Sequence, residues 1–129
     1  MVPFRLVSQP GVPIGEQVVF AAKKAILGGK LNPGDPFPSV RTLARAMKIH
    51  ANTAQKVISQ LVAEGLLQVQ PGIGTIVVQP PQPRNGRGRL PARDLEQLAV
   101  QAMQVGMSLN EVEAALRECW RRLAGVEVR

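Results

Sequence analysis

The chain has 129 residues, which is enough for one ordinary domain or for one small domain with an appendage. Its single cysteine, Cys119, excludes an intramolecular disulfide framework and a cysteine-based zinc site. No apolar run is long enough to cross a bilayer, and the N-terminus is typical of neither a signal peptide nor a transit peptide. We therefore expect a cytoplasmic protein that does not contact a membrane.

The charge is unevenly distributed along the chain. Residues 1–91 hold eleven Lys and Arg against three acidic residues, whereas residues 92–129 hold five Arg against six acidic residues. The total is +7. A basic front part indicates contact with a polyanion such as nucleic acid, although the same excess could serve solubility alone.

The first predicted element is a helix that begins at Pro13 and ends at Gly28-Gly29. Its predicted inward face consists of Ile14, Val18, Ala21, Ala22, Ala25 and Ile26. The segment that follows, LNPGDPFP, contains three X-Pro steps, which exclude a helix and indicate a turn.

Two short helices joined by a tight break are predicted next. Ser39 is a good N-cap for a helix over residues 40–47, and a break at Lys48-Ile49 leads to a second helix over residues 51–64. Their predicted inward side chains are Val40, Leu43, Ala44, Met47, Ala54, Val57, Ile58 and Leu61. Strand-like runs at 66–70 and 75–79, separated by PGIG, then predict a β-hairpin.

The remaining residues are predicted to form a linker and a tail of two helices. Residues 80–92 are rich in Pro, Gly and Arg, as linkers are. One tail helix ends at Gly106, and a capping box from Ser108 to Glu111 opens the other. Each helix carries an apolar stripe that two helices of this length cannot bury within one chain, so we expect a homodimer formed through the tail.

The predicted dimerisation residues are Leu95, Leu98, Ala102, Val105, Leu109, Val112, Leu116, Trp120 and Leu123. Cys119 lies beside this stripe and is predicted to be a small core residue rather than a redox sensor.

This order of elements is that of a winged helix-turn-helix. The expected fold is mainly α, with a winged helix-turn-helix domain at 1–79, a linker at 80–92 and a two-helix dimerisation region at 93–129. A DNA major groove admits one helix, whose N-terminal side chains reach base edges. Asn52, Thr53, Gln55 and Lys56 lie away from the inward stripe of the second short helix, so we expect them to face DNA.

Several motifs taken together resemble the DNA-binding domain of the GntR family of bacterial regulators, over about residues 13–79. They are Gly34-Asp35, Pro38-Ser39-x-Arg41-x-Leu43-Ala44, Asn52-Thr53, Leu61-x-x-Glu64-Gly65 and Gly72-x-Gly74-Thr75. The Asn52-Thr53-x-Gln55-Lys56 stretch and the short tail are similar to the YtrA-type subfamily, which lacks a large effector-binding domain. The resemblance implies a homodimeric repressor on an inverted-repeat DNA operator, near a transporter operon.

The resemblance also implies DNA-binding roles at particular positions. Ser39 and Arg41 match the start of the family's second helix, His50 matches the head of its recognition helix, and Gly72 and Gly74 match the tip of its wing. The complete predicted DNA-binding set is Ser39, Arg41, His50, Asn52, Thr53, Gln55, Lys56, Gly72 and Gly74. The chain departs from the family at Gly15, His50, Ala51 and Pro71.

Other roles stay open for several of these residues. Arg41 could be an ordinary solvated side chain, Asn52 could serve the start of its helix, and His50 could be a phosphate contact, a weak cap or a pH-sensitive group. The linker residues Arg84, Arg87 and Arg89 are either solvated charge or a basic arm that follows DNA.

Neither an enzyme, nor a cofactor, nor a metal site is expected, since no nucleophile–base pair, carboxylate dyad or metal constellation is apparent. The alternative function is a winged-helix module that binds protein without specific DNA. The polar head of the second short helix argues against it, because protein interfaces favour aromatic residues and Met. A small-molecule effector stays open, with Met103, Met107 and Trp120 as candidate lining of a groove between two tails.

Overall fold

The computed structural model describes residues 4–6, 9–78 and 90–125. The chain divides into two compact units, residues 1–81 and 82–129. The predicted linker, including Arg84, Arg87 and Arg89, falls largely outside the described residues. Among the helices that are described, none combines the length and the apolar character needed to span a bilayer.

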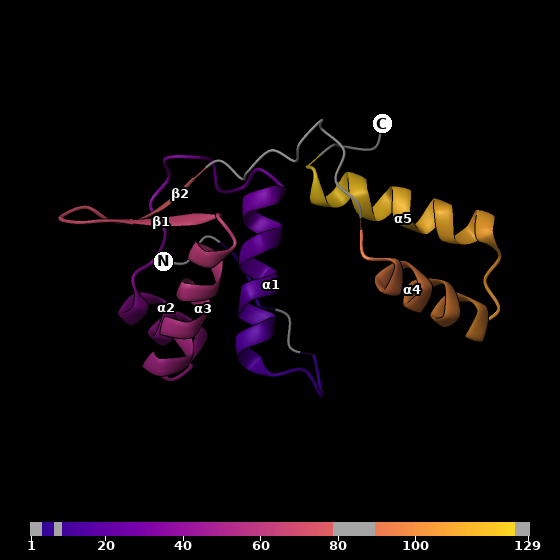
Figure 1. Ribbon diagram of the computed structural model, residues 1–129, viewed down its shortest axis with the longest axis horizontal. Helices are drawn as coiled ribbons and strands as arrows, with labels where there is room; N and C mark the ends of the chain where they lie inside the picture. The colour runs from indigo at the N-terminus through magenta and orange to yellow at the C-terminus, as the bar shows by residue number, and fades with distance from the viewer. Residues whose placement is uncertain (1–3, 7–8, 79–89, 126–129) are drawn as a thin grey trace. The chain divides into compact units, whose positions relative to one another are not determined.

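The first unit is a winged helix-turn-helix, as predicted (Figure 1). It contains the helices α1 (Ile14–Leu27), α2 (Val40–Met47) and α3 (Ala51–Ala63), followed by the strands β1 (Leu67–Gln70) and β2 (Gly74–Val77). The strands pair antiparallel, with Leu67 opposite Val77 and Gln70 opposite Gly74. Each strand is one residue shorter than its predicted run, and β2 begins one residue earlier than predicted, because Gly74 of the predicted turn pairs with Gln70.

Local signals in the sequence fix the ends of these helices. The Ser39 hydroxyl accepts a hydrogen bond from the backbone N–H of Thr42 at 3.2 Å, which caps α2 as predicted. Lys48 ends α2 in the left-handed conformation, with φ of 57°. Because a residue in this conformation ends the helix and turns the chain sharply, α3 can begin only three residues later, at Ala51.

One apolar core holds the three helices and the hairpin together. The residues of α3 predicted to face inward are all buried, whereas Val40, Ala44 and Met47 of α2 are only partly buried against the core. The buried core is made of Val18, Val19, Ala22, Ala25, Ile26, Leu31, Phe37, Leu43, Ala54, Val57, Ile58, Leu61, Leu66, Leu67 and Val77. The prediction for Ile14 is wrong, because this residue in the first turn of α1 is 41% exposed.

The segment before α2 is bound to the hairpin, which the sequence did not predict. The backbone N–H of Gly34 donates to the carbonyl of Val77, and that of Phe37 donates to the carbonyl of Thr75, each at 2.8 Å. Pro36 forms a bridge with Ile76. The X-Pro steps keep the segment extended, so it pairs with the free edge of β2 and connects the wing to the start of α2.

A segment before α1 also packs on this unit. The rings of Phe4 and Phe37 are stacked with centroids 5.9 Å apart. The buried Gln17 side chain accepts from the N–H of Gln9 at 3.0 Å and donates to the carbonyls of Gln9 and Val12 at 3.0 and 2.7 Å. A buried amide is stable only when it is hydrogen-bonded, so Gln17 fixes the path of the chain into α1.

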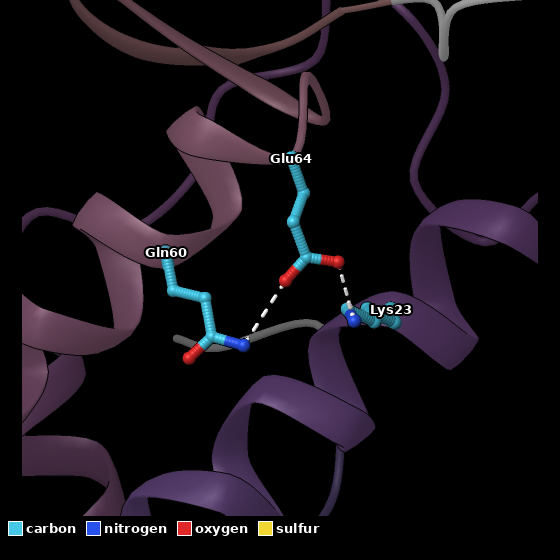
Figure 2. Close-up of polar contacts among 3 residues, drawn as sticks. All are labelled: Lys23, Gln60 and Glu64. Carbon is cyan, nitrogen blue, oxygen red and sulfur yellow. Dashed lines mark hydrogen bonds and ion pairs between the residues drawn. The ribbon is translucent and has the colours of Figure 1, made fainter.

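An ion pair joins α1 to the last turn of α3 (Figure 2). The ammonium of Lys23 contacts the carboxylate of Glu64, which also accepts a hydrogen bond from the Gln60 amide at 3.0 Å. The hydrogen bonds from Lys23 and Gln60 hold the pKa of Glu64 below its ordinary value. These contacts fix the C-terminal end of α3, and the apolar core fixes its buried face.

The second unit is a hairpin of two helices, α4 (Ala92–Gln104) and α5 (Leu109–Leu123), which lie side by side in Figure 1. Ser108 and Glu111 form the predicted capping box at the start of α5. Ala102 is the one buried residue of α4, and α5 has none. Cys119 is exposed, which contradicts its predicted core position, since the unit is too small to cover this face of α5.

Candidate nucleic-acid interface

The first turns of α3 present polar side chains outward while the opposite face is locked into the core. Asn52, Gln55 and Lys56 are exposed, whereas Ala54 and Val57 are buried. The backbone N–H of Ala54 donates to the carbonyl of His50 at 3.0 Å and so closes the first helical turn. A helix held in this way can offer amide and ammonium groups to a groove without exposing its apolar stripe.

His50 is the N-cap residue of α3, yet its side chain makes no capping hydrogen bond. The imidazole is therefore exposed beside the helix start rather than folded onto it. Backbone N–H groups at a helix N-terminus favour anions, and phosphate oxygens are common partners for them. His50 lines a shallow hollow of about 380 Å³ together with Lys48 and Thr53.

The helix-turn-helix has an unbalanced positive charge. Residues 36–63 contain Arg41, Arg45, Lys48 and Lys56 and no acidic residue. All four cations are exposed, and the only ion pair among the described residues is that of Lys23 with Glu64. Arg41 and Lys56 are among the predicted DNA-binding residues, whereas Arg45 and Lys48 are not, although the acid-free run from 36 to 63 contains all four.

Two of the predicted side chains already have partners within the protein. The Ser39 hydroxyl, besides capping α2, donates to the hydroxyl of Thr42 at 3.1 Å. The Gln55 amide donates to the Ser59 hydroxyl at 3.2 Å, one helical turn further on. Both side chains are exposed. The Ser39 hydroxyl positions the start of α2 through its cap, and the side-chain carbonyl oxygen of Gln55 is still available to a ligand.

Thr53 differs from its prediction, because it is half-buried rather than fully outward. A Cβ atom built at Gly15 would lie 3.3 Å from the methyl carbon of Thr53. The start of α1 thus lies against the start of α3, and the absence of a side chain at Gly15 lets the two helices approach. The Thr53 methyl faces α1, so less of this side chain is exposed than its position outside the inward stripe predicted.

The wing tip is formed by two glycines around one apolar residue. Gly72 and Gly74 are exposed and adopt φ of 78° and 117°, a region that other residues rarely occupy. Ile73 lies between them with 74% of its surface exposed. The hairpin from 67 to 77 contains no charged residue, so its approach to DNA would depend on backbone and apolar contacts.

The predicted DNA-binding residues all lie in the first unit, on α2, on α3 and at the wing tip. In the part of the chain that the structure describes, no three His, Cys, Asp or Glu side chains come together as metal ligands would. The helix-turn-helix, residues 36–63, offers cations, amides and hydroxyls without any acidic residue, which suits a polyanion.

Comparison with known proteins agrees with this chemistry. Residues 14–77 match the family described as bacterial regulatory proteins, gntR family. The HTH-type transcriptional repressor YtrA of Bacillus subtilis is 31% identical over 108 residues, which cover 82% of this chain and 83% of YtrA. An alignment of this length extends beyond the winged domain into the helical tail.

Two solved structures extend the comparison. A crystal structure described as a transcriptional antiterminator from Listeria monocytogenes has a TM-score of 0.77 at 20% identity, with 98% of this chain and 96% of that chain covered, and supports the fold alone. The DNA-binding domain of AraR in complex with operator ORX1 is 30% identical, with a TM-score of 0.51, and covers 57% of this chain and 93% of that chain.

The family match, the similarity to YtrA over most of both chains and the winged helix-turn-helix lead to one assignment. The chain belongs to the GntR family of bacterial regulatory proteins, which are DNA-binding transcriptional regulators and not enzymes, and it resembles the YtrA type in its short helical tail.

Proposed function

We propose that the protein is a repressor that binds an inverted-repeat DNA operator as a homodimer, with one winged domain on each half-site. A twofold dimer calls for half-sites about one helical turn, or ~10 bp, apart. The relatives YtrA and NagR of Bacillus subtilis are both named as transcriptional repressors, which supports repression here. The resemblance to the YtrA type makes a transporter operon the expected target.

The observation that carries this proposal is the division of α3 into two faces. Its buried face fixes the helix in the core, while Asn52, Gln55 and Lys56 remain exposed at its leading turns. Amide side chains pair with adenine in the major groove, and arginine pairs with guanine. We therefore assign base contacts to Arg41, Asn52 and Gln55, and a phosphate contact to Lys56.

The remaining predicted residues have supporting roles. The Thr53 hydroxyl and the His50 ring adjoin the first turn of α3, where they can reach phosphate or sugar. The glycines Gly72 and Gly74 let the wing backbone approach the minor-groove edge. Ser39 keeps α2, and hence Arg41, in position through its cap.

Dimerisation through the second unit rests on its exposed apolar surface. Within the described residues, the predicted stripe of α4 and α5 is largely exposed, with Ala102 buried and Val112 half-buried. Contiguous apolar surface of this kind usually marks an interaction site. A second copy that covers it would also set the spacing of the two winged domains on DNA.

Selection of bound sequences from random DNA would test the function directly. We expect an enriched inverted repeat, and Arg41→Ala or Gln55→Ala should weaken binding to it by ~1–3 kcal/mol and relax the preference at one position of each half-site. Lys56→Ala should instead weaken binding to all sequences alike. Arg93→Ala and Gln97→Ala, the same changes at exposed positions of α4, are the matched controls.

A protein-interaction module would behave differently. Its DNA binding would be blind to sequence and would vanish at physiological salt, because only counterion release would drive it. Random-sequence selection with no enriched motif, together with unchanged binding of the Arg41 and Gln55 variants, would refute the proposal.

A further inference from the structure

Most apolar side chains of α5 are exposed. No residue of α5 is buried, and Leu109 and Trp120 are 72% and 71% exposed. One shallow hollow of about 430 Å³ is lined by Glu113, Leu116, Arg117, Trp120 and Arg121. A second hollow, of about 410 Å³, lies between α4 and α5. Leu116 lines both hollows and so lies in the middle of the exposed face.

The apolar stripe of α5 is symmetric about Leu116. Val112 and Trp120 each lie four positions from it, and Leu109 and Leu123 each lie seven positions from it. A twofold axis through Leu116 would therefore place each apolar residue of one antiparallel helix level with an apolar residue of the other. Such matching of a patch with itself is what a twofold interface requires.

The charges along the same face distinguish antiparallel from parallel pairing. Glu113 lies three positions before Leu116, whereas Arg117 and Arg121 lie one and five positions after it. In an antiparallel pair centred on Leu116, each Glu113 would come level with position 119 of the other helix, about 3 Å along the axis from both arginines. In a parallel pair these three side chains would lie on opposite edges of the two helices and would not face those of the other copy.

We propose that two copies of this chain associate by packing α5 antiparallel against α5, with the twofold axis at Leu116 and with Glu113 of each copy between Arg117 and Arg121 of the other. This proposal deepens the dimer of the proposed function and rests on it. The partner is a second copy because both the apolar spacing and the charges of this helix complement themselves.

Disulfide cross-linking in the Cys119→Ser background tests the arrangement. In an antiparallel pair the two Cα atoms of residue 109 are about 21 Å apart along the axis, which is far beyond the ~7 Å limit for a disulfide. Leu116→Cys should therefore cross-link to itself, and Leu109→Cys and Leu123→Cys should not. When these last two variants are mixed, they should cross-link to each other.

Charge exchange gives a second, independent measurement on the full chain. The dissociation constant of the dimer can be followed by sedimentation and by the fluorescence of Trp120, the only tryptophan. Glu113→Arg should raise this constant by roughly tenfold, and adding Arg117→Glu and Arg121→Glu to the same chain should restore it. In a parallel pair these side chains would not face one another, so the constant would not change.

The outcomes separate this proposal from the function it rests on. Self-cross-linking of Leu109→Cys, or a dimer without the mixed cross-link and without the charge effect, would overturn the antiparallel pairing while operator binding persists. A chain that sediments as a monomer at every concentration would overturn both the pairing and the dimeric function.

Discussion

Ile73, at the tip of the wing, determines whether the wing adds to the salt dependence of DNA binding. It is largely exposed at the tip of a hairpin without charged residues, so the wing should contribute little to the salt dependence of binding. We predict that Ile73→Lys tightens binding to operator and unrelated DNA alike. The slope of log K against log salt should steepen by about 0.9 for the added phosphate contact.

Fluorescence anisotropy titrations at several salt concentrations would measure that slope. Ile73→Gln is the matched control, because it replaces the apolar side chain with a polar one of similar size but adds no charge. An unchanged slope for Ile73→Lys would mean that the wing tip stays away from the phosphates.

The periodicity of α3 was sufficient to predict the exposure of Asn52, Gln55 and Lys56, because burial of a helix face follows its own apolar stripe. It failed for Thr53, since the surface that half-buries this residue belongs to α1. Gly15, which lies against Thr53, is about forty positions away in the sequence, so the residue pattern of α3 alone cannot predict this contact. The exposure of a site residue is thus predictable only where a single element determines it.

At the scale of elements, the turn between α2 and α3 contains a local strain. Lys48 adopts φ of 57° and is the only residue other than glycine with positive φ in the described part of the chain. A side chain in this region costs about 1 kcal/mol, which glycine avoids. We predict that Lys48→Gly raises the free energy of unfolding by about 0.5–1 kcal/mol.

Chemical denaturation would measure the change. Lys48→Ala is the control, because it removes the same charge but keeps a Cβ atom in the strained conformation. The glycine variant should therefore be more stable than the alanine variant. Equal stability of the two would show that the turn relaxes without cost.

Element boundaries were predictable wherever a local signal marks them. The Ser39 cap, the capping box from Ser108 to Glu111 and the proline before α1 all lie where the structure begins a helix. The pairing of Pro36 with Ile76 and the burial of Gln17 were not predictable. Both depend on groups that meet only after the chain folds, and a turn-forming segment has the same local sequence whether or not it joins a sheet.

For the whole molecule, the charge division along the sequence corresponds to two kinds of surface. The winged unit carries the excess of cations, and the tail balances its arginines with acidic residues. A basic unit that meets DNA and a near-neutral unit that meets its own copy would keep the two interactions separate. Salt should then weaken DNA binding steeply while it affects dimerisation much less.

Each unit also contains a glutamate whose pKa lies below its ordinary value. The cause for Glu64 is hydrogen bonding from Lys23 and then Gln60, and for Glu111 it is the backbone N–H and then the hydroxyl of Ser108. A folded-state pKa below the unfolded one stabilises the fold above the unfolded value, near pH 4.3, and this contribution is lost as pH falls through the folded value. We predict that both units lose stability on acidification below about pH 4.5.

Thermal unfolding followed from pH 7 to pH 3 would test this for the winged unit. Glu64→Gln should lower the stability at pH 7 by only about 0.5 kcal/mol, because the ion pair is partly exposed and screened by solvent. Once the pH falls below the folded-state pKa of Glu64, the variant and the original chain should converge, since Glu64 is then protonated in both states of the original chain. Glu16→Gln, the same change at an exposed position of α1, is the control. A Glu64→Gln variant whose deficit stayed constant down to pH 3 would show that the carboxylate charge does not stabilise the contact between α1 and α3.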